Sequence, residues 1–302
     1  MHLPADLAKK GIINMAKQIL LSADTPCDIG PILKQRYQVS LFPLHILLDG
    51  EQYTDGLDIT PDAIYKAWWD KKILPRTAAI NPEEYCAYFE PFLQQGYDIL
   101  HINIGSSLSS CYQNAKTASE RLQSKGRVFV IDSCSLSTGI GLLVCEAGER
   151  ISAGLSIETI YDEILGLVPK TRASFVLDTL EFMHAGGRCS GIVHVSADVF
   201  SIKPMILVRN ERQGSMTVGK KFMGKLDHAL IKYVESLLKG RNDIALDRAF
   251  VTHSTTDPAM VQMVIELVKQ YQPFAEIHET TASCTIGAHC GPGTLGVLFL
   301  TK

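Results

Sequence analysis

The densest group of side chains that could do chemistry is a run of four serines, Ser106, Ser107, Ser109 and Ser110. The run follows Gly105 and an apolar stretch at residues 99–104, and a helix-forming stretch at residues 112–122 comes after it. This order predicts a buried strand, a hydroxyl-rich turn and the N-terminal end of a helix. Such an end carries roughly half a positive charge. Hydroxyls and free backbone N–H groups there suit a carboxylate or a phosphate, although serine also caps ordinary helices.

A nucleophilic serine is the sharper alternative for the same turn. The elbow of serine hydrolases requires G-x-S-x-G, in which the last glycine allows a strained turn. Residues 105–109 fail this pattern at the final position, where Ser109 replaces the glycine. The turn therefore favours ligand binding over a hydrolase elbow.

A second candidate site is the segment 287–293, in which His289 stands among three glycines. Glycine lets the backbone approach a ligand closely, and histidine can donate to a carboxylate or act as an acid or base. We expect a glycine loop here, with an ordinary surface-loop histidine as the alternative. Gly186 and Gly187 precede Arg188, and they permit a tight turn that presents the guanidinium group.

Two other patterns carry less weight. Residues 214–221 resemble a P-loop, but Lys221 replaces the Ser or Thr that binds magnesium, and the segment has the pattern of a hairpin. Cys284, His289 and Cys290 lie close in sequence without a fourth ligand, so we expect no metal site and no other cofactor. The eight cysteines form no C-x-x-C pair, which is typical of reduced cytosolic thiols.

The composition is that of an ordinary globular protein. The chain has 302 residues, of which 46% are hydrophobic and 20% charged, and its net charge is −3. This charge gives no indication of a nucleic acid or an anionic membrane as partner. No apolar run approaches the roughly 20 residues that a membrane-spanning helix needs, and no secretory signal is visible. We expect a cytoplasmic protein without stable membrane insertion.

The order of the expected elements predicts an α/β protein with two domains. Strands and helices alternate up to about residue 168, which indicates parallel pairing with right-handed crossovers in a Rossmann-like, mostly parallel sheet. A hairpin around residues 210–214 and further strands indicate a C-terminal α+β domain with a mostly antiparallel sheet. Ligands of parallel sheets lie outside the carboxyl ends of the strands, where the serine turn falls.

The expected boundaries follow from this change of pattern. Residues 1–14 are expected to be an N-terminal extension, because Met15 starts a stretch that looks like a fresh protein start. Residues 15–170 form the α/β domain and residues 171–302 the α+β domain, with the ligand between the two. Within the first domain we expect one strand at 39–48 and an exposed link at 75–79.

Several motifs occur together in the order found in the DegV family of fatty-acid-binding proteins, which this chain resembles over residues 15–302. The matching segments are residues 23–28, 42–44, 53–56, 76–77, 106–113, 130–133, 186–188, 202–204 and 286–293. Each segment is short, and their shared order carries the resemblance.

The resemblance implies a function and a set of site residues. Family members bind one long-chain fatty acid, of the palmitate or oleate class, between two α/β domains. By motif, Thr77 and Ser109 hydrogen-bond the carboxylate, Ser107 is a further candidate, and Arg188 and His289 lie at or beside the head group. The protein is then an acyl-carrying subunit without its own catalysis, and a separate fatty acid kinase subunit phosphorylates the bound carboxylate.

Some positions depart from the family pattern. Ala78 stands where the family usually has a serine, and Ser110 where it usually has a glycine. Lys220 and Lys221 lie in a stretch that usually contains arginine, which affects the expected contacts with a kinase.

Two other functions stay open at this point. An acyl-transfer or hydrolytic enzyme would use Ser109 or Ser107 with His289, but it also needs an acid that orients the histidine, and no convincing one is found. The other alternative is a sensor of a different amphipathic carboxylate.

Overall fold

The computed structural model describes residues 18–190, 192 and 202–302, and the expected extension at residues 1–14 lies outside them. The first sheet has the strand order β2-β1-β6-β7, and its three strand pairs are all parallel. Its strands are β1 (Ile19–Asp24), β2 (Ser40–Phe42), β6 (Asp98–Asn103) and β7 (Val128–Asp132). The apolar run of β6 is buried throughout, which suits a central strand covered on both faces.

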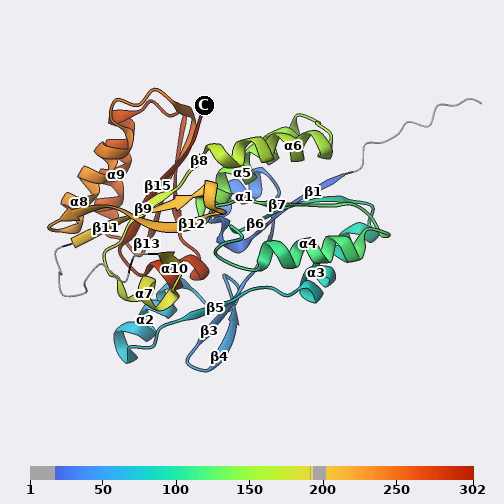
Figure 1. Cartoon of the computed structure of the whole chain (residues 1–302), viewed down its shortest axis with the longest axis horizontal. Helices are drawn as coiled ribbons and strands as arrows, with labels where there is room; N and C mark the ends of the chain where they lie inside the picture. Colours follow the sequence, from blue (N-terminus) through green and yellow to red (C-terminus); the bar gives the residue numbers. More distant parts are fainter. Residues whose placement is uncertain (1–17, 191, 193–201) are drawn as a thin grey trace, which may run out of the picture.

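Helices cover this sheet and connect its strands (Figure 1). They are η1 (Thr25–Cys27), α1 (Gly30–Arg36), α3 (Pro82–Gln94), α4 (Cys111–Leu122), α5 (Thr138–Ser152), α6 (Ile157–Leu167) and η2 (Val168–Lys170). The start of α3 follows from its sequence, because Asn81 and Glu84 form a reciprocal capping box and Pro82 occupies the first helical position.

The first domain also contains a small antiparallel sheet. It has the order β4-β3-β5 and consists of β3 (His45–Leu48), β4 (Glu51–Thr54) and β5 (Arg76–Ala78), with α2 (Pro61–Lys71) between β4 and β5. The expected single strand at 39–48 is wrong, since β2 and β3 belong to different sheets and Pro43, which has no N–H to donate, lies between them. The expected link at 75–79 is also wrong, because Thr77 in β5 pairs with Ile46 in β3.

The second sheet is mostly antiparallel, as predicted, and two of its strand pairs, β10–β12 and β13–β14, are parallel. Its order is β10-β12-β11-β9-β15-β13-β14, and β8 also pairs with β15. The strands are β8 (Thr171–Arg172), β9 (Ser174–Val176), β10 (Cys189–Ser190), β11 (Ile202–Arg209), β12 (Ser215–Met223), β13 (Ile244–Ser254), β14 (Glu276–Thr281) and β15 (Thr294–Thr301). The predicted α/β class with two domains is confirmed; the boundary at residues 170 and 171 stays a prediction.

The remaining helices lie in the second half of the chain. They are α7 (Glu181–Gly186), η4 (Asn210–Arg212), α8 (Leu226–Leu238), α9 (Pro258–Tyr271) and α10 (Cys284–Cys290). Figure 1 shows α8 and α9 together on the outer side of this sheet and α10 near the centre of the molecule.

The expected glycine loop at 287–293 is wrong in its first half, where α10 is a helix. Ser283 caps it by accepting a hydrogen bond from the N–H of Ile286. A Cβ on Gly287 would lie 2.4 Å from the Tyr65 hydroxyl oxygen, so this glycine serves close packing between helices. Gly291 and Gly293, with φ of +75° and +72°, form the turn that follows.

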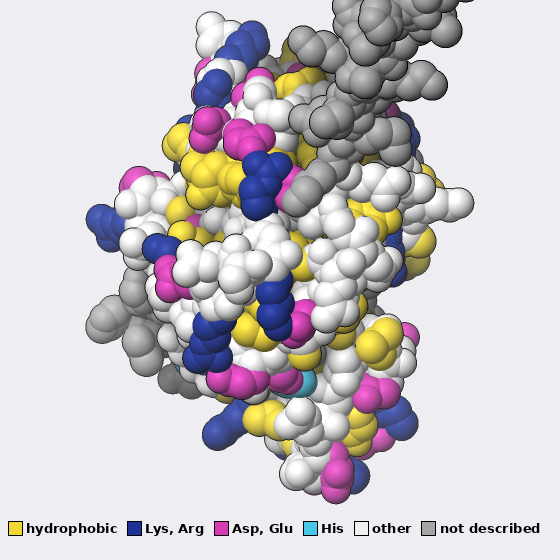
Figure 2. Space-filling view, turned by 90° about the vertical axis from the view of Figure 1, so that its right-hand side faces the viewer, with side chains coloured by type: hydrophobic (Ala, Val, Ile, Leu, Met, Phe, Trp, Pro, Cys, Tyr) yellow, Lys and Arg dark blue, Asp and Glu magenta, His cyan; other side chains and the backbone are white. Residues whose placement is uncertain are grey.

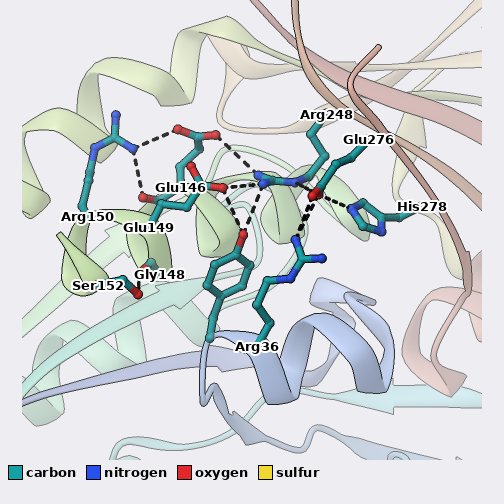
Figure 3. A network of polar contacts seen from close by, with 10 residues as sticks. Arg36, Glu146, Gly148, Glu149, Arg150, Ser152, Arg248, Glu276 and His278 are labelled. Carbon is teal, nitrogen blue, oxygen red and sulfur yellow. Dashed lines mark hydrogen bonds and ion pairs between the residues drawn. The ribbon is translucent and has the colours of Figure 1, made fainter.

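Side chains from both domains meet in a charged network (Figure 3). Arg248 of β13, only 6% exposed, binds Glu149 of α5 and lies 3.5 Å from Glu276 of β14. Arg36 of α1 also binds Glu276, at 3.0 Å. This network ties helices of the first domain to the edge of the second sheet.

The described part of the chain contains no helix long and apolar enough to cross a bilayer. Figure 2 shows one face of the molecule, on which basic and acidic side chains are interspersed. The mixture of charges on this face agrees with the small net charge.

Candidate ligand-binding site

A cavity of about 240 Å³ lies where β5, the serine turn, α10 and the second sheet meet. Four of the five predicted site residues line it, namely Thr77, Ser109, Arg188 and His289. Ser107 is exposed and is not among the lining residues, so the structure does not bring it into this group. The apolar lining comes from Leu44, Ile104, Leu108, Leu136, Met216 and Ile286.

The serine turn has fewer free backbone N–H groups than the sequence predicts. The N–H of Ser106 donates to Asp132 at 3.1 Å, and that of Ser107 donates to the carbonyl of Gln213 at 3.1 Å. The N–H of Leu108 donates within the turn. The turn therefore offers a ligand mainly its hydroxyls, because three of its amides serve to hold its shape.

Burial sets the charge state of His289. Its Nε2 lies 2.9 Å from Thr77 Oγ1, although 212 residues separate the two in sequence. Burial, and to a lesser degree the positive charge of Arg188, lowers the pKa of His289 to about 4. The imidazole is therefore neutral near pH 7, and when Nε2 donates to Thr77 the hydroxyl of Thr77 is free to donate to a ligand.

Arg188 supplies the positive charge of the cavity. It follows Gly187, whose φ of +65° ends α7 in the left-handed region. Its guanidinium group donates to the carbonyl of Gly186 at 2.6 Å, and its side chain is otherwise exposed. Of the described residues that line the cavity, Arg188 alone is permanently charged.

Two buried carboxylates from the first domain position α10. Asp55 accepts hydrogen bonds from the N–H groups of Cys284 and Thr285 and from the Thr285 hydroxyl. Asp28 accepts from the N–H of Ser283 at 3.0 Å and from the hydroxyl of Ser137 at 2.6 Å. These contacts fix the helix that carries His289.

Three contributors to this site were not expected from the sequence. Thr285 and Met216 line the cavity, and Asp55 anchors α10. Asp55 lies in one of the segments that carry the family resemblance, which is the signal that could have pointed to it. Met216 lies in an expected strand, and an apolar side chain there gives no indication of a binding site. Ala78 and Ser110, the two departures from the family pattern, also line the cavity.

A second, smaller cavity of about 20 Å³ continues inward. It shares Leu136, Ile286 and Cys290 with the first cavity, and Phe175 and Leu298 of the second sheet add to its apolar lining. The first cavity carries the polar groups near Ser109, and the second is lined by apolar side chains together with the hydroxyls of Ser137, Thr252, Ser254 and Thr294.

The hydrogen bonds do not form a nucleophilic relay. Ser109 Oγ donates to Cys111 Sγ at 3.2 Å and accepts from the N–H of Cys111. In the described ranges no hydrogen bond joins Ser109 to His289, and His289 Nδ1 has no hydrogen-bond partner. A Ser-His-acid triad needs both of these contacts. In the same part of the chain, no group of three or more His, Cys, Asp or Glu side chains is placed to hold a metal ion.

The fold and the site define a two-domain α/β protein with a partly open site between its sheets, lined by polar groups near Ser109 and by apolar side chains further in. A family model described as that of an uncharacterised protein, DegV, matches residues 18–302. The chain belongs to the DegV family.

Two curated relatives span nearly the whole chain. A DegV domain-containing protein of Clostridium acetobutylicum is 27% identical over 286 residues, which cover 95% of this chain and 99% of that protein. Another from Caldanaerobacter subterraneus is 28% identical over 287 residues, which cover 95% of this chain and 100% of the relative.

Solved structures share the fold. A DegV family protein from Thermus thermophilus, described as binding a fatty acid, has a TM-score of 0.82 and 26% identity, and the match covers 94% of this chain and 100% of that one. A DegV family protein from Eubacterium eligens, loaded with heptadecanoic acid, has a TM-score of 0.80 at 21% identity, with 94% and 100% covered.

Proposed function

We propose that this protein binds one long-chain fatty acid, of the palmitate or oleate class, between its two domains. The carboxylate lies at Thr77, Ser109 and Arg188, with His289 behind Thr77, and the acyl chain runs toward the second cavity. The observation that carries this proposal is the convergence of one cation, one neutral histidine and the hydroxyls of Thr77 and Ser109 in a cavity that Ser110 and Thr285 also line and whose other lining side chains are apolar.

The energetics of burial support this class of ligand. Each methylene that leaves water contributes roughly 0.8 kcal/mol, so a long acyl chain favours binding strongly. A carboxylate in the same dry site is costly unless it is paired and hydrogen-bonded. Arg188 and the hydroxyls of Thr77 and Ser109 would meet that need. The second cavity measures only about 20 Å³, so a long chain requires its lining side chains to move apart.

The protein in this proposal is a carrier and not an enzyme. It presents the bound carboxylate to a separate kinase subunit, which forms the acyl phosphate. The partners of Ser109 support this assignment, because its hydroxyl is engaged with Cys111 and not with His289. A cytoplasmic location belongs to the same proposal, and the eight free cysteines suit a reducing compartment.

Binding of palmitate by single variants tests the proposed head-group residues. Ser109→Ala and Thr77→Val should each weaken binding about tenfold, which corresponds to the loss of one hydrogen bond to a charged group. Arg188→Gln should weaken it at least as much. Ser107→Ala is the matched control, because Ser107 is exposed and lies outside the cavity lining. Equal affinity in all four variants would remove these residues from the site.

An esterase assay separates the carrier from the acyl-transfer alternative. The carrier is expected to show no turnover of a palmitoyl ester above the rate without protein. Turnover that disappears in Ser109→Ala or His289→Gln would show that the protein is an enzyme.

A further inference from the structure

The second cavity contains a polar group that a plain acyl chain cannot satisfy. Ser254, at the end of β13, lines this cavity and is 1% exposed. Its hydroxyl oxygen is completely buried and has no hydrogen-bond partner. A buried hydroxyl without a partner is destabilising, and methylene groups packed against it would leave it so.

The other hydroxyls around this cavity are already engaged. Ser137 donates to Asp28 at 2.6 Å, and Thr294 donates to the carbonyl of Cys290 at 2.9 Å. Thr252 lies within 2.8 Å of two further threonine hydroxyls, Thr138 and Thr280. Ser254 therefore stands apart from its neighbours in having an unused donor and acceptor.

The strand geometry directs Ser254 toward the space between the domains. Side chains alternate between the two faces of a strand, so Ser254 lies on the same face as Thr252. Thr252 contacts Thr138 of α5 and thus faces the first domain. His253 pairs with Glu279 at 3.3 Å and also contributes to the cavity lining.

A second hydroxyl lies next to Ser254. Burial raises the pKa of Tyr65, and Ser254 is close enough to lower it in part. Hydrogen bonding between the two hydroxyls accounts for that lowering, but the pair falls outside strict hydrogen-bond geometry, so both oxygens can still bond to a ligand. A hydroxyl group placed beside them could both donate and accept, which a methylene or a keto group cannot do.

We propose that the preferred ligand is a hydroxylated long-chain fatty acid, whose chain hydroxyl binds Ser254 in the second cavity. The inference rests on the proposed fatty acid binding and specifies the class of acid. The cavity of about 20 Å³ has to widen for the chain that carries this hydroxyl, as it does for any acyl chain, and the widened space then includes the Ser254 hydroxyl. Ser254 is then the residue that distinguishes a hydroxylated chain from a plain one.

Calorimetric binding of a matched set of acids tests this proposal on the delipidated full-length protein. The set contains stearate and three hydroxystearates, with the hydroxyl near the carboxylate, at mid-chain and near the terminal methyl. We expect one hydroxy isomer to bind at least tenfold more tightly than stearate. In Ser254→Ala that preference should disappear, while stearate binds as tightly as before or more tightly.

Two control variants accompany the test. Ser236→Ala removes a hydroxyl on α8 that bonds to the carbonyl of Tyr233 and does not line either cavity, so the preference should persist. Ser254→Cys has a side chain of similar size and a weaker hydrogen-bond donor. It replaces the alanine variant in the test if that variant does not fold, and the preference for the hydroxy isomer should then be reduced.

Each outcome decides a different claim. Stearate binding with no gain for any hydroxy isomer overturns the hydroxyl proposal and leaves fatty acid binding intact. A preference that persists in Ser254→Ala removes Ser254 from the proposal. Failure of all four acids to bind the folded protein overturns the proposed function itself.

Discussion

At the scale of single residues, burial shifts two ionisable groups near the cavity in opposite directions. Burial lowers the pKa of His289 to about 4 and raises the pKa of Asp28 to about 7. Near neutral pH the histidine is therefore uncharged, and the cavity depends on Arg188 for its positive charge. Asp28 titrates in the same pH range. Its carboxyl group accepts hydrogen bonds from the N–H of Ser283, next to α10, and from the hydroxyl of Ser137, next to α5.

The raised pKa of Asp28 predicts a pH dependence of stability. Because the folded-state value of about 7 lies above the ordinary value of 3.8, the folded protein binds this proton more tightly than the unfolded chain. The stabilisation of the folded protein by this proton is fully present below about pH 4 and is lost as the pH rises to about 7. Asp28→Asn should remove this part of the slope, so its free energy of unfolding should rise relative to the wild type as the pH increases. Because the amide nitrogen cannot accept from Ser137, the variant should be less stable than the wild type at low pH.

Urea unfolding at a series of pH values measures the effect. Asp62→Asn is the control, because Asp62 is exposed in the first turn of α2. An Asp28→Asn variant whose pH profile parallels that of the wild type would contradict the prediction.

At the scale of elements, α10 depends on close packing against α2. A Cβ on Gly287 would approach the Tyr65 hydroxyl oxygen to 2.4 Å, whereas nothing lies within 4 Å of a Cβ placed on Gly166 of α6. Gly287→Ala should therefore lower the free energy of unfolding by about 1–3 kcal/mol, the range for overpacking. Gly166→Ala should raise it by up to about 1 kcal/mol, because alanine favours a helix.

A double variant identifies the cause. The Tyr65 hydroxyl has no hydrogen-bond partner, so Tyr65→Phe alone should cost little. Combined with Gly287→Ala, it should restore most of the lost stability, measured by denaturant unfolding. Additive losses in the double variant would mean that the hydroxyl is not the obstacle.

At the scale of the whole molecule, the network around Arg248 joins the two domains (Figure 3). Arg248 contacts Glu146 and Glu149 of α5, Glu276 of β14 and the hydroxyl of Tyr37. Arg248→Met should lower the free energy of unfolding by roughly 2–4 kcal/mol, because it leaves several carboxylates without their central cation.

An exposed ion pair provides the matched comparison for Arg248. Lys66→Met breaks the exposed pair with Asp70 in α2, which is worth about 0.3–0.5 kcal/mol. Chemical unfolding of both variants checks the difference. Equal, small losses would show that the network does not stabilise the domain arrangement.

Some elements of the fold follow from local sequence patterns, and others depend on contacts between distant parts of the chain. The parallel sheet and the hairpin of the second sheet follow from local patterns, since buried apolar runs and turn residues mark each strand. The helix α10 does not, because its stability depends on Asp28 and Asp55 from far along the chain. Strand β5 was missed because three residues carry no periodicity and its partner β3 lies about 30 residues earlier.

The candidate site was predicted in part, and mainly through the resemblance. The serine turn was found from its composition alone. Thr77 and His289 lie 212 residues apart, so no local pattern could place them 2.9 Å from each other. Ser107 was grouped with Ser109 because the two are near in sequence, but the turn exposes one and directs the other into the cavity lining.

Native mass spectrometry of the delipidated protein with added palmitate tests the central claim most directly. We expect the mass of the folded protein to increase by one palmitate per chain, with no second equivalent at a modest excess. We also expect that Ser109→Ala loses the bound acid at lower collision energy than Ser107→Ala. A protein that stays folded and takes up neither palmitate nor oleate would contradict the proposal that this site binds a long-chain fatty acid.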